Sequence, residues 1–464
     1  MTFSIIQKSQ LEGARRLDAE YFQPEYLSLE KNILETKLFK KWGELKGEFI
    51  TGPFGSEFNI ENYTSDNEYR YLRGKDVKPF FVLNDDNVYM PKDDFDRLKK
   101  YSLRENDLLL SVVGTLGNVA IVSKNDLPSI FSCKSTIFRA GELNALYLLA
   151  YLNSKYGRGL ILRNARGQVQ TGLNIEDLKS LMIYIPPLEK QNEISIFVEE
   201  SRKLLSQSKD YYLRAEELLL EELGLKDYKI EDDLFYEVNL SELRFAHRAD
   251  PEYFQPKYSR LIQAIKNKNA KPLGDLVSMK KGFEPGREAY QEEGKVFIRV
   301  SSVSKFGIEE KDQKYLSEDN YQQLKQSFEP KVGEILLTKD ATPGVVYTIK
   351  EPVSGIISGG VLRLKAKSEI DPEFLSLYIN SVAGQMQVEQ DSGGSVIAHW
   401  KPEQIKSLLV PVLPKNTQQK IADLVKKSHE ARKKSKELLE EAKRKVEEMI
   451  RKGAGEERVK ALNQ

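Results

Sequence analysis

One segment of this chain occurs twice, and the repeat limits the folds open to the chain more than any other feature. The residues Glu20–Pro24 recur unchanged as Glu252–Pro256, and Asp18 corresponds to Asp250, 232 positions later. The chain is therefore a duplication of about half its length. A duplicated chain favours a molecule with pseudo-twofold symmetry, and such a molecule suits a target with two related halves.

The similarity continues beyond this motif at a nearly constant offset. Three pairs of segments match, namely Tyr71–Val77 with Phe297–Val303, Leu109–Gly117 with Leu336–Gly344, and Lys179–Ile183 with Lys406–Val410. Other segments differ, since Gly52–Ser56 has no close counterpart in Gly282–Gly286. Each half is therefore expected to keep one scaffold and to carry its own surface.

Length and composition set the broad class. A chain of 464 residues exceeds one ordinary core, so two to four domains are expected. Hydrophobic content of 40% with 30% charged residues is typical of a soluble globular protein. Because Cys133 is the one cysteine, the chain cannot form an intramolecular disulfide. Without a bilayer-length apolar run or a secretory pattern, we expect a cytoplasmic protein. The net charge of +1 argues against an acidic DNA mimic and leaves DNA binding open.

Both halves show the same order of elements: a short leader, a β-rich body and a long helix. Short β-branched runs separated by turn signals, such as Asn118–Val122 and Gly344–Ile349, predict strands in the bodies. The fold class is therefore α+β with a substantial twisted sheet. The expected division is 1–187 for the first leader and body, 188–226 for a central helix, 227–413 for the second leader and body, and 414–464 for a C-terminal helix.

The two long helices are predicted from a heptad pattern. Prolines at 186, 187 and 414 end the preceding strands, and apolar or small residues then recur at alternating steps of three and four. The expected seam is Ile194, Phe197, Ser201, Leu204, Ser208, Tyr211, Ala215 and Leu218 in one helix, and Ile421, Leu424, Ser428, Ala431, Ser435, Leu438 and Ala442 in the other. Small residues at matched positions allow close approach, so we expect the helices to pack on each other, antiparallel if a twofold relates the halves. The alternative is that each helix packs only on its own domain.

The residues of common enzymes are missing from the chain. His247, His399 and His429 are the three histidines, no pair has metal-ligand spacing, and no CxxC occurs. No phosphate-binding GxxxxGK[ST] loop and no GxGxxG after a strand is present. Ile185–Leu188 lacks the polar residue of an amino-methyltransferase tetrapeptide. The chain is therefore expected to be non-catalytic, to bind no metal and to carry no cofactor.

With these features the chain resembles the specificity subunits of Type I restriction–modification systems. The resemblance rests on the twofold repeat, the segments Leu109–Gly117 and Leu336–Gly344, the run Ile185–Gln191, and the long helix that ends each half. Together these features span nearly the whole chain. The second half departs from the proline pattern, with Val412–Lys415 and Gln418 at the matching place.

The resemblance implies two pseudo-twofold-related, β-rich target recognition domains joined by two long antiparallel coiled-coil helices. Each domain would read one half of a bipartite double-stranded DNA site, and the helices would set the gap. A helix of ~30 residues spans ~45 Å, and one turn of duplex is ~34 Å long. The family further implies docking of two methyltransferase subunits, which bind S-adenosylmethionine, and of two restriction (nuclease–translocase) subunits.

Such a role needs phosphate contacts for position and base contacts for specificity. Arginine suits guanine and glutamine suits adenine, each worth roughly 1–3 kcal/mol of discrimination. The candidates are polar residues in segments that differ between the halves or border the shared strands: Ser56, Arg73, Lys75, Thr115, Arg163, Gln168 and Gln170 in the first domain, and Arg287, Arg299, Ser301, Lys339, Thr342, His399 and Lys401 in the second.

Structural roles compete with DNA contact at several of these positions. Arg73 and Arg299 match in the repeat, so a shared salt bridge is as good an interpretation. The threonines beside glycines favour turns, His399 favours loop packing, and Arg163 with Arg166 fits either a solvated face or DNA. The repeated Tyr-Phe-Gln-Pro motif cannot distinguish two half-sites, which favours packing or subunit docking.

Two other functions remain open from the residues alone. One is an enzyme, a stand-alone DNA methyltransferase or nuclease with unrecognised motifs, which would turn over substrate by itself. The other is a coiled-coil scaffold whose bodies bind protein, which would be indifferent to DNA. Divergent surfaces on a shared scaffold favour the DNA-binding specificity subunit over both.

Overall fold

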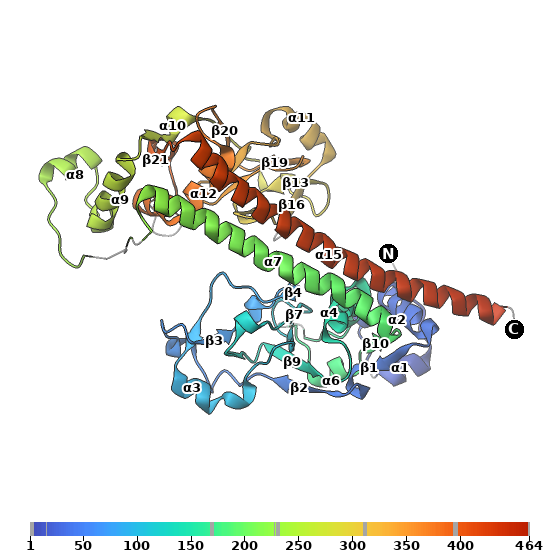
Figure 1. Cartoon of the computed structure of the whole chain (residues 1–464). Coiled ribbons are helices and arrows are strands. Elements are labelled where there is room, and N and C mark those ends of the chain that lie inside the picture. The colour runs from blue at the N-terminus through green and yellow to red at the C-terminus, as the bar shows by residue number, and fades with distance from the viewer. Residues whose placement is uncertain are drawn as a thin grey trace. The chain divides into compact units, whose positions relative to one another are not determined.

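In the computed structural model, the described residues are 4–14, 16–167, 171–226, 228, 233–309, 313–392 and 398–462 (Figure 1). The chain forms two compact units. Unit 1 comprises residues 1–204 and 433–464, and unit 2 comprises residues 205–432. Both divisions fall inside long helices, α7 (Leu188–Leu223) and α15 (Lys415–Leu462). Each unit therefore holds a segment of both helices.

Unit 1 contains a leader of two helices, a β-rich body and a helical cover. Its helices are α1 (Lys8–Ala14), α2 (Pro24–Thr36), α3 (Lys92–Arg97), α4 (Ala145–Asn153), α5 (Lys155–Arg163) and α6 (Ile175–Lys179). Its strands are β1 (Phe39–Lys41), β2 (Gly47–Thr51), β3 (Tyr69–Leu72), β4 (Phe80–Phe81), β5 (Tyr89–Met90), β6 (Leu108–Ser111), β7 (Val119–Ile121), β8 (Ser129–Phe131), β9 (Ser135–Ala140) and β10 (Met182–Tyr184). They form sheets in the orders β2-β9-β6-β7-β4, β5-β3-β8 and β1-β10.

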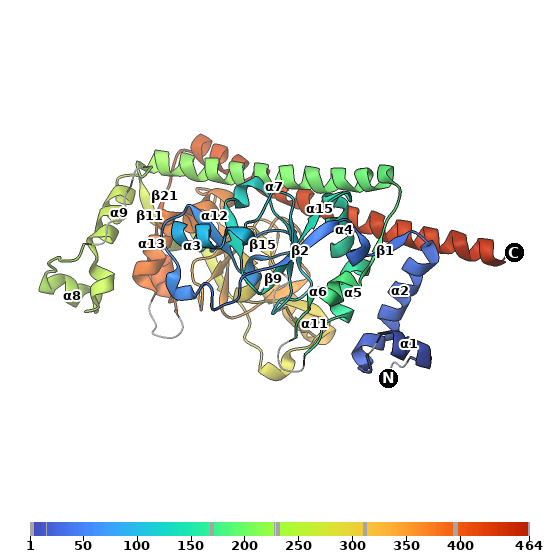
Figure 2. The same ribbon diagram turned by 90° about the horizontal axis from the view of Figure 1, so that it is seen from below.

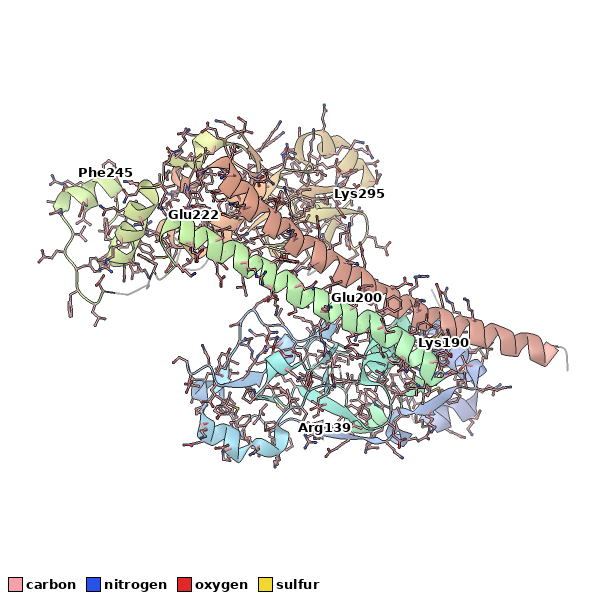
Figure 3. The ribbon with its side chains drawn as sticks, viewed as in Figure 1. Arg139, Lys190, Glu200, Glu222, Phe245 and Lys295 are labelled. Atoms are coloured by element: carbon pink, nitrogen blue, oxygen red, sulfur yellow. The ribbon has the colours of Figure 1, made fainter. Side chains whose placement is uncertain are left out.

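The central strand β6 shows why this body folds. Leu108 and Leu110 pack into the cluster that includes Tyr147 of α4, while Leu109 packs into a second cluster on the other side. The alternation follows the two-residue period of a strand. Beside β6, Arg139 of β9 (labelled in Figure 3) donates two hydrogen bonds of 2.8 Å to the buried carboxylate of Asp107. The sheet therefore has apolar packing on both faces and a buried ion pair next to β6.

Unit 2 repeats this plan. Its helices are α8 (Leu240–Ala246), α9 (Pro256–Lys266), α10 (Leu273–Leu276), α11 (Glu318–Phe328), α12 (Pro372–Asn380), α13 (Val382–Asp391) and α14 (Pro402–Ser407). Its strands are β11 (Ala270–Pro272), β12 (Val277–Lys281), β13 (Lys295–Ile298), β14 (Val303–Ser304), β15 (Gly307–Ile308), β16 (Lys314–Leu316), β17 (Ile335–Thr338), β18 (Val346–Thr348), β19 (Gly355–Ile357), β20 (Val361–Ala366) and β21 (Leu409–Pro411). α9 lies beside the β11–β21 pair (Figure 2).

Strand order establishes that the two units share one scaffold. The order β12-β20-β17-β18 in unit 2 corresponds to β2-β9-β6-β7 in unit 1. Likewise β16-β13-β19 corresponds to β5-β3-β8, and β11-β21 to β1-β10. The predicted α+β class and the duplication are confirmed.

The long helices pack antiparallel in each unit. In unit 1, the Ser201 and Ser435 hydroxyls are 2.8 Å apart, and Lys445 donates a 2.9 Å hydrogen bond to Glu193. Hydrogen bonds from Lys445 and then Lys190 lower the pKa of Glu193 to about 2. In unit 2, the Ser208 and Ser428 hydroxyls are 3.1 Å apart. The partner numbers fall as the α7 numbers rise, as the seam predicts for antiparallel helices.

Ile194 and Ile421 of the predicted seam are buried, but four other apolar positions of the seam were wrong. Val198, Tyr212 and Leu219 of α7 and Val425 of α15 are buried, one residue after the predicted Phe197, Tyr211, Leu218 and Leu424, which are partly exposed. These buried side chains belong to the cores of the units. The helices therefore serve two interfaces, and burial follows a stripe wider than the strict 3.5-residue seam. The predicted serines and alanines at 201, 208, 215, 428, 431, 435 and 442 are buried.

Candidate nucleic-acid interface

In unit 1, four loops meet at the ends of strands β3, β6 and β8. The amide of Ser132 donates to the carbonyl of Leu72, that of Val112 to Lys134, and that of Leu173 to Val112, at 2.9 to 3.0 Å. A Cβ on Gly74 would approach the Cβ of Lys134 to 3.0 Å. These bonds join residues 73–77, 111–117, 132–134 and 171–173, called here the edge loops of unit 1. They bring together the predicted Arg73, Lys75 and Thr115.

Unit 2 builds the matching edge. The amide of Ser358 donates to Ile298, that of Lys339 to Gly360, and that of Trp400 to Lys339, at 2.8 to 3.0 Å. Residues 299–303, 338–344, 358–360 and 398–401 are the edge loops of unit 2. They bring together six predicted residues: Arg299, Ser301, Lys339, Thr342, His399 and Lys401.

The same turn shapes one loop in each unit. The hydroxyl of Thr338 donates to the carbonyl of Thr342 at 2.5 Å, and the hydroxyl of Ser111 donates to that of Thr115. The turn ends at a glycine with positive φ, +88° at Gly344. Thr115 and Thr342 are therefore exposed turn residues, as the sequence favoured, and their side chains remain open to a ligand.

Arg73 and Lys75 are held by carboxylates. Arg73 donates to both oxygens of the buried Asp76, at 3.0 and 3.1 Å, and its guanidinium lies 3.3 Å from Asp86. Lys75 donates to the same Asp86 at 2.8 Å. Arg73 thus forms the salt bridge that its position in the repeat suggested.

His399 and Lys339 meet at Asp340. The Nδ1 atom of His399 lies 2.8 Å from one carboxylate oxygen, and Lys339 donates to the other at 2.5 Å. Burial opposes ionisation of Asp340, but the hydrogen bonds from Lys339 and His399 lower its pKa. Lys339 is largely buried, whereas His399 is exposed. His399 therefore packs onto its neighbouring loop and still presents a ring edge to solvent.

The prediction of Arg163 as a DNA contact is wrong. Its side chain is 4% exposed, its guanidinium lies 4.0 Å above the ring of Tyr21, and its Nε donates to the Tyr21 carbonyl at 2.9 Å. It also pairs with Glu30 of α2 at 2.9 Å. The arginine lies inside unit 1, where it fixes the leader against α5. In unit 2, Gln390 donates to the Tyr253 carbonyl at 3.0 Å in its place.

The repeated motif is a packing element in both units. Arg16 donates to Asp18 and lies 4.6 Å above the ring of Tyr21. Arg248 donates to Asp250 and lies 4.4 Å above Tyr253. The sequence favoured packing or subunit docking for this motif, and the packing role is confirmed.

The remaining predicted residues are scattered or undescribed. Ser56 lies in an exposed turn outside the edge loops. Gln168 and Gln170, together with the side chain of Arg287, lie outside the described residues.

Sequence reasoning missed Lys134 and Lys281. Lys134 is exposed in the edge loops of unit 1, and Lys281 ends β12, where it lies with Glu284 beside Gly359. Lys281 is the last residue of β12 and Lys134 lies between β8 and β9, so an exposed lysine at a strand end was the available signal.

Metal sites and membrane-spanning helices are absent from the described part of the chain. No group of three or more histidine, cysteine or acidic side chains there could hold a metal ion. Nor does any helix among them have the length and apolar character needed to cross a membrane.

Comparison with known proteins adds three findings. The family model described as "Type I restriction modification DNA specificity domain" matches residues 50–209 and 265–444. The Type I restriction enzyme EcoBI specificity subunit of Escherichia coli is 26% identical over 103 residues, and the alignment spans 22% of each chain. Two solved structures align over 89% of this chain: a Type I restriction–modification S subunit from M. genitalium (17% identity, 95% of that chain, TM-score 0.44) and the HsdS subunit from Thermoanaerobacter tengcongensis (15%, 96%, 0.28).

Proposed function

Because the chain belongs to the family of Type I restriction modification DNA specificity domains, we propose that its two units read the two halves of a bipartite DNA target. The observation that carries the proposal is one scaffold used twice with different edge loops. Because the two units share a scaffold, their edge loops occupy equivalent positions. The side chains on these loops differ, so each unit can recognise a different half-site. Members of this family recognise DNA and do not catalyse, and the proposed role is recognition without chemistry.

The polar residues of the edge loops support duplex binding. The exposed Lys75, Lys134 and Lys401 supply cations for phosphates, while Ser301 and Thr342 supply hydroxyls at exposed turns. Phosphate contacts position a protein on DNA, and contacts to base edges specify sequence. Because the net charge is only +1, binding must come from these local groups rather than from a general basic field.

We assign the gap and the docking of partners to the long helices. α7 has 36 residues, which correspond to roughly 54 Å at 1.5 Å per residue. Two methyltransferase subunits, which would carry S-adenosylmethionine, and two restriction subunits would assemble around this chain. The complex would act in the cytoplasm, where the DNA is.

Methylation mapping tests the proposal. Genomic DNA is sequenced by a single-molecule method from cells that carry the chain with the methyltransferase of the same system, and from cells that lack only this chain. The expected result is a methylated bipartite adenine motif that disappears without the chain. An active methyltransferase whose motif does not depend on the chain would contradict the proposal.

A further inference from the structure

Arg73 and Arg299 occupy the same place in the two units. Each directly follows a strand of the three-stranded sheet, β3 or β13, and each precedes a short 3-10 helix, Gly74–Asp76 or Val300–Ser302. Figure 3 labels Lys295 at the start of β13, the strand that ends before Arg299. Sequence alone therefore gives the two arginines one role.

The surroundings of the two arginines differ in charge. In unit 1, Asp76 accepts two hydrogen bonds from the Arg73 side chain and a third, of 2.8 Å, from its backbone amide. Asp86 adds a second carboxylate at 3.3 Å. The Arg73 side chain is only 17% exposed. Its Nε and Nη2 groups donate within the protein, and the arginine fixes the loop that follows β3.

In unit 2, Ser302 stands at the place of Asp76. It is fully buried, and its hydroxyl has no hydrogen-bond partner among the described residues. The guanidinium of Arg299 forms no hydrogen bond or ion pair with any residue that the structure describes. The nearby carboxylate of Asp340 is already engaged by Lys339 and His399. Arg299 therefore carries an uncompensated charge at a partly exposed position.

We propose that Arg299 contacts DNA and that Arg73 is a structural clamp, an inference that rests on the proposed function. A partly buried cation without a partner is costly, and the cost is recovered when an acceptor arrives. The planar guanidinium matches paired acceptors, which DNA offers as phosphate oxygens or as guanine O6 and N7. The two units thus use the equivalent arginine differently, and at this position unit 2 carries a charge contact to DNA that unit 1 lacks.

The test compares Arg299→Ala with Arg73→Ala in the full chain. Affinity is measured by fluorescence anisotropy on a duplex that carries the motif from methylation mapping. Arg299→Ala should weaken binding about tenfold and reduce the slope of log affinity against log salt by about one if the partner is a phosphate. Arg73→Ala should lower the thermal unfolding midpoint and change affinity by less than about threefold, as expected of a residue without a DNA contact.

Ser302→Asp tests the cause without removing the arginine. Asp at this position recreates the partner of Arg73, so it should engage Arg299 and weaken DNA binding to the same extent as Arg299→Ala. The double variant Arg299→Ala with Ser302→Asp should be no weaker than either single variant. Thermal unfolding shows whether the Ser302→Asp variant folds. If it does not fold, the comparison of Arg299→Ala with Arg73→Ala tests the inference.

Arg299→Lys separates the two DNA partners. If affinity is kept with an unchanged motif, the acceptor is a phosphate. If one base of the motif becomes degenerate, the acceptor is a guanine edge. Wild-type affinity in Arg299→Ala, or an equal loss in a folded Arg73→Ala, would overturn the inference while the proposed function stands. Absence of binding by the wild-type chain, alone and with its methyltransferase, would remove both.

Discussion

Removal of Arg163 should destabilise unit 1 rather than weaken DNA contact directly. Its guanidinium joins the Tyr21 ring, the Tyr21 carbonyl and Glu30, so it holds α2 and the repeated motif on α5. An alanine removes all three interactions and leaves Glu30, whose side chain is 27% exposed, without this partner.

The expected magnitude follows from these contacts. A hydrogen bond from a charged donor contributes roughly 1.5–3 kcal/mol, and a cation–π contact about 0.5–1 kcal/mol. The ion pair is partly solvated, so it adds less than the 3–5 kcal/mol typical of a broken buried pair. Arg163→Ala should therefore cost about 3 kcal/mol. For a unit of this size, that corresponds to a fall of roughly 6–12 °C in its unfolding midpoint.

Unit 2 supplies the matched control. Gln390 makes the single carbonyl hydrogen bond at the equivalent position, so Arg163→Gln should recover that bond and cost only about 1.5 kcal/mol. Calorimetry gives the midpoints, and hydrogen exchange shows whether the loss is in α2 and α5. The reasoning is refuted if Arg163→Ala keeps the wild-type midpoint and exchange but loses DNA affinity, since the arginine would then face the duplex.

Three further predictions concern single sites. Burial, with help from Lys350 and Arg432, lowers the pKa of His429 to about 3, below its unfolded value, so unit 2 should lose stability as the pH falls from about 6.5 towards 3. His429→Phe should reduce that loss in urea unfolding at pH 7 and pH 5; equal losses in both proteins would contradict the assignment. Ser201→Leu, in the close helix contact, should cost about 1–3 kcal/mol in chemical denaturation, whereas Ser206→Leu at an exposed position should be nearly neutral; similar values would refute the tight seam. Thr338→Val should cost about 1–2 kcal/mol and Thr338→Ser much less, because the hydroxyl accepts from Val345 and donates to Thr342; equal costs would show that the turn does not need the hydroxyl.

Much of the fold could be predicted from the sequence because the sequence contains an internal duplication. The match of Leu109–Gly117 with Leu336–Gly344 predicted equivalent strands and turns, and β6 and β17 carry them. The helix starts were visible as well, since α7 begins at Leu188 directly after two prolines. Four apolar positions of the seam were displaced by one residue because a heptad pattern cannot show that residues such as Val198 and Tyr212 also pack into the cores of the units.

The site was harder to predict than the fold. Arg163 and Arg73 were sound candidates by residue type and place, but their partners, Glu30 and Asp76, decide their roles. Asp76 is only three residues from Arg73, and the second half has Ser302 at the matching position. That difference in the sequence could have shown that only Arg73 has a carboxylate partner there. Glu30 is far from Arg163 in sequence, and only the packing of α2 on α5 brings the two together. Ion pairing of surface candidates therefore needs tertiary contacts as well as residue type.

The central claim is that each unit reads one half-site, and exchange of one body tests it most directly. Residues 37–185 are a suitable segment because its ends meet at the β1–β10 pair, where Phe39 lies opposite Tyr184. This segment would be replaced with the matching one from a relative of different specificity, and the methylated motif mapped again. We expect one half of the motif to change while the other half and the gap stay the same. A motif that changes in both halves, or in neither, would contradict it.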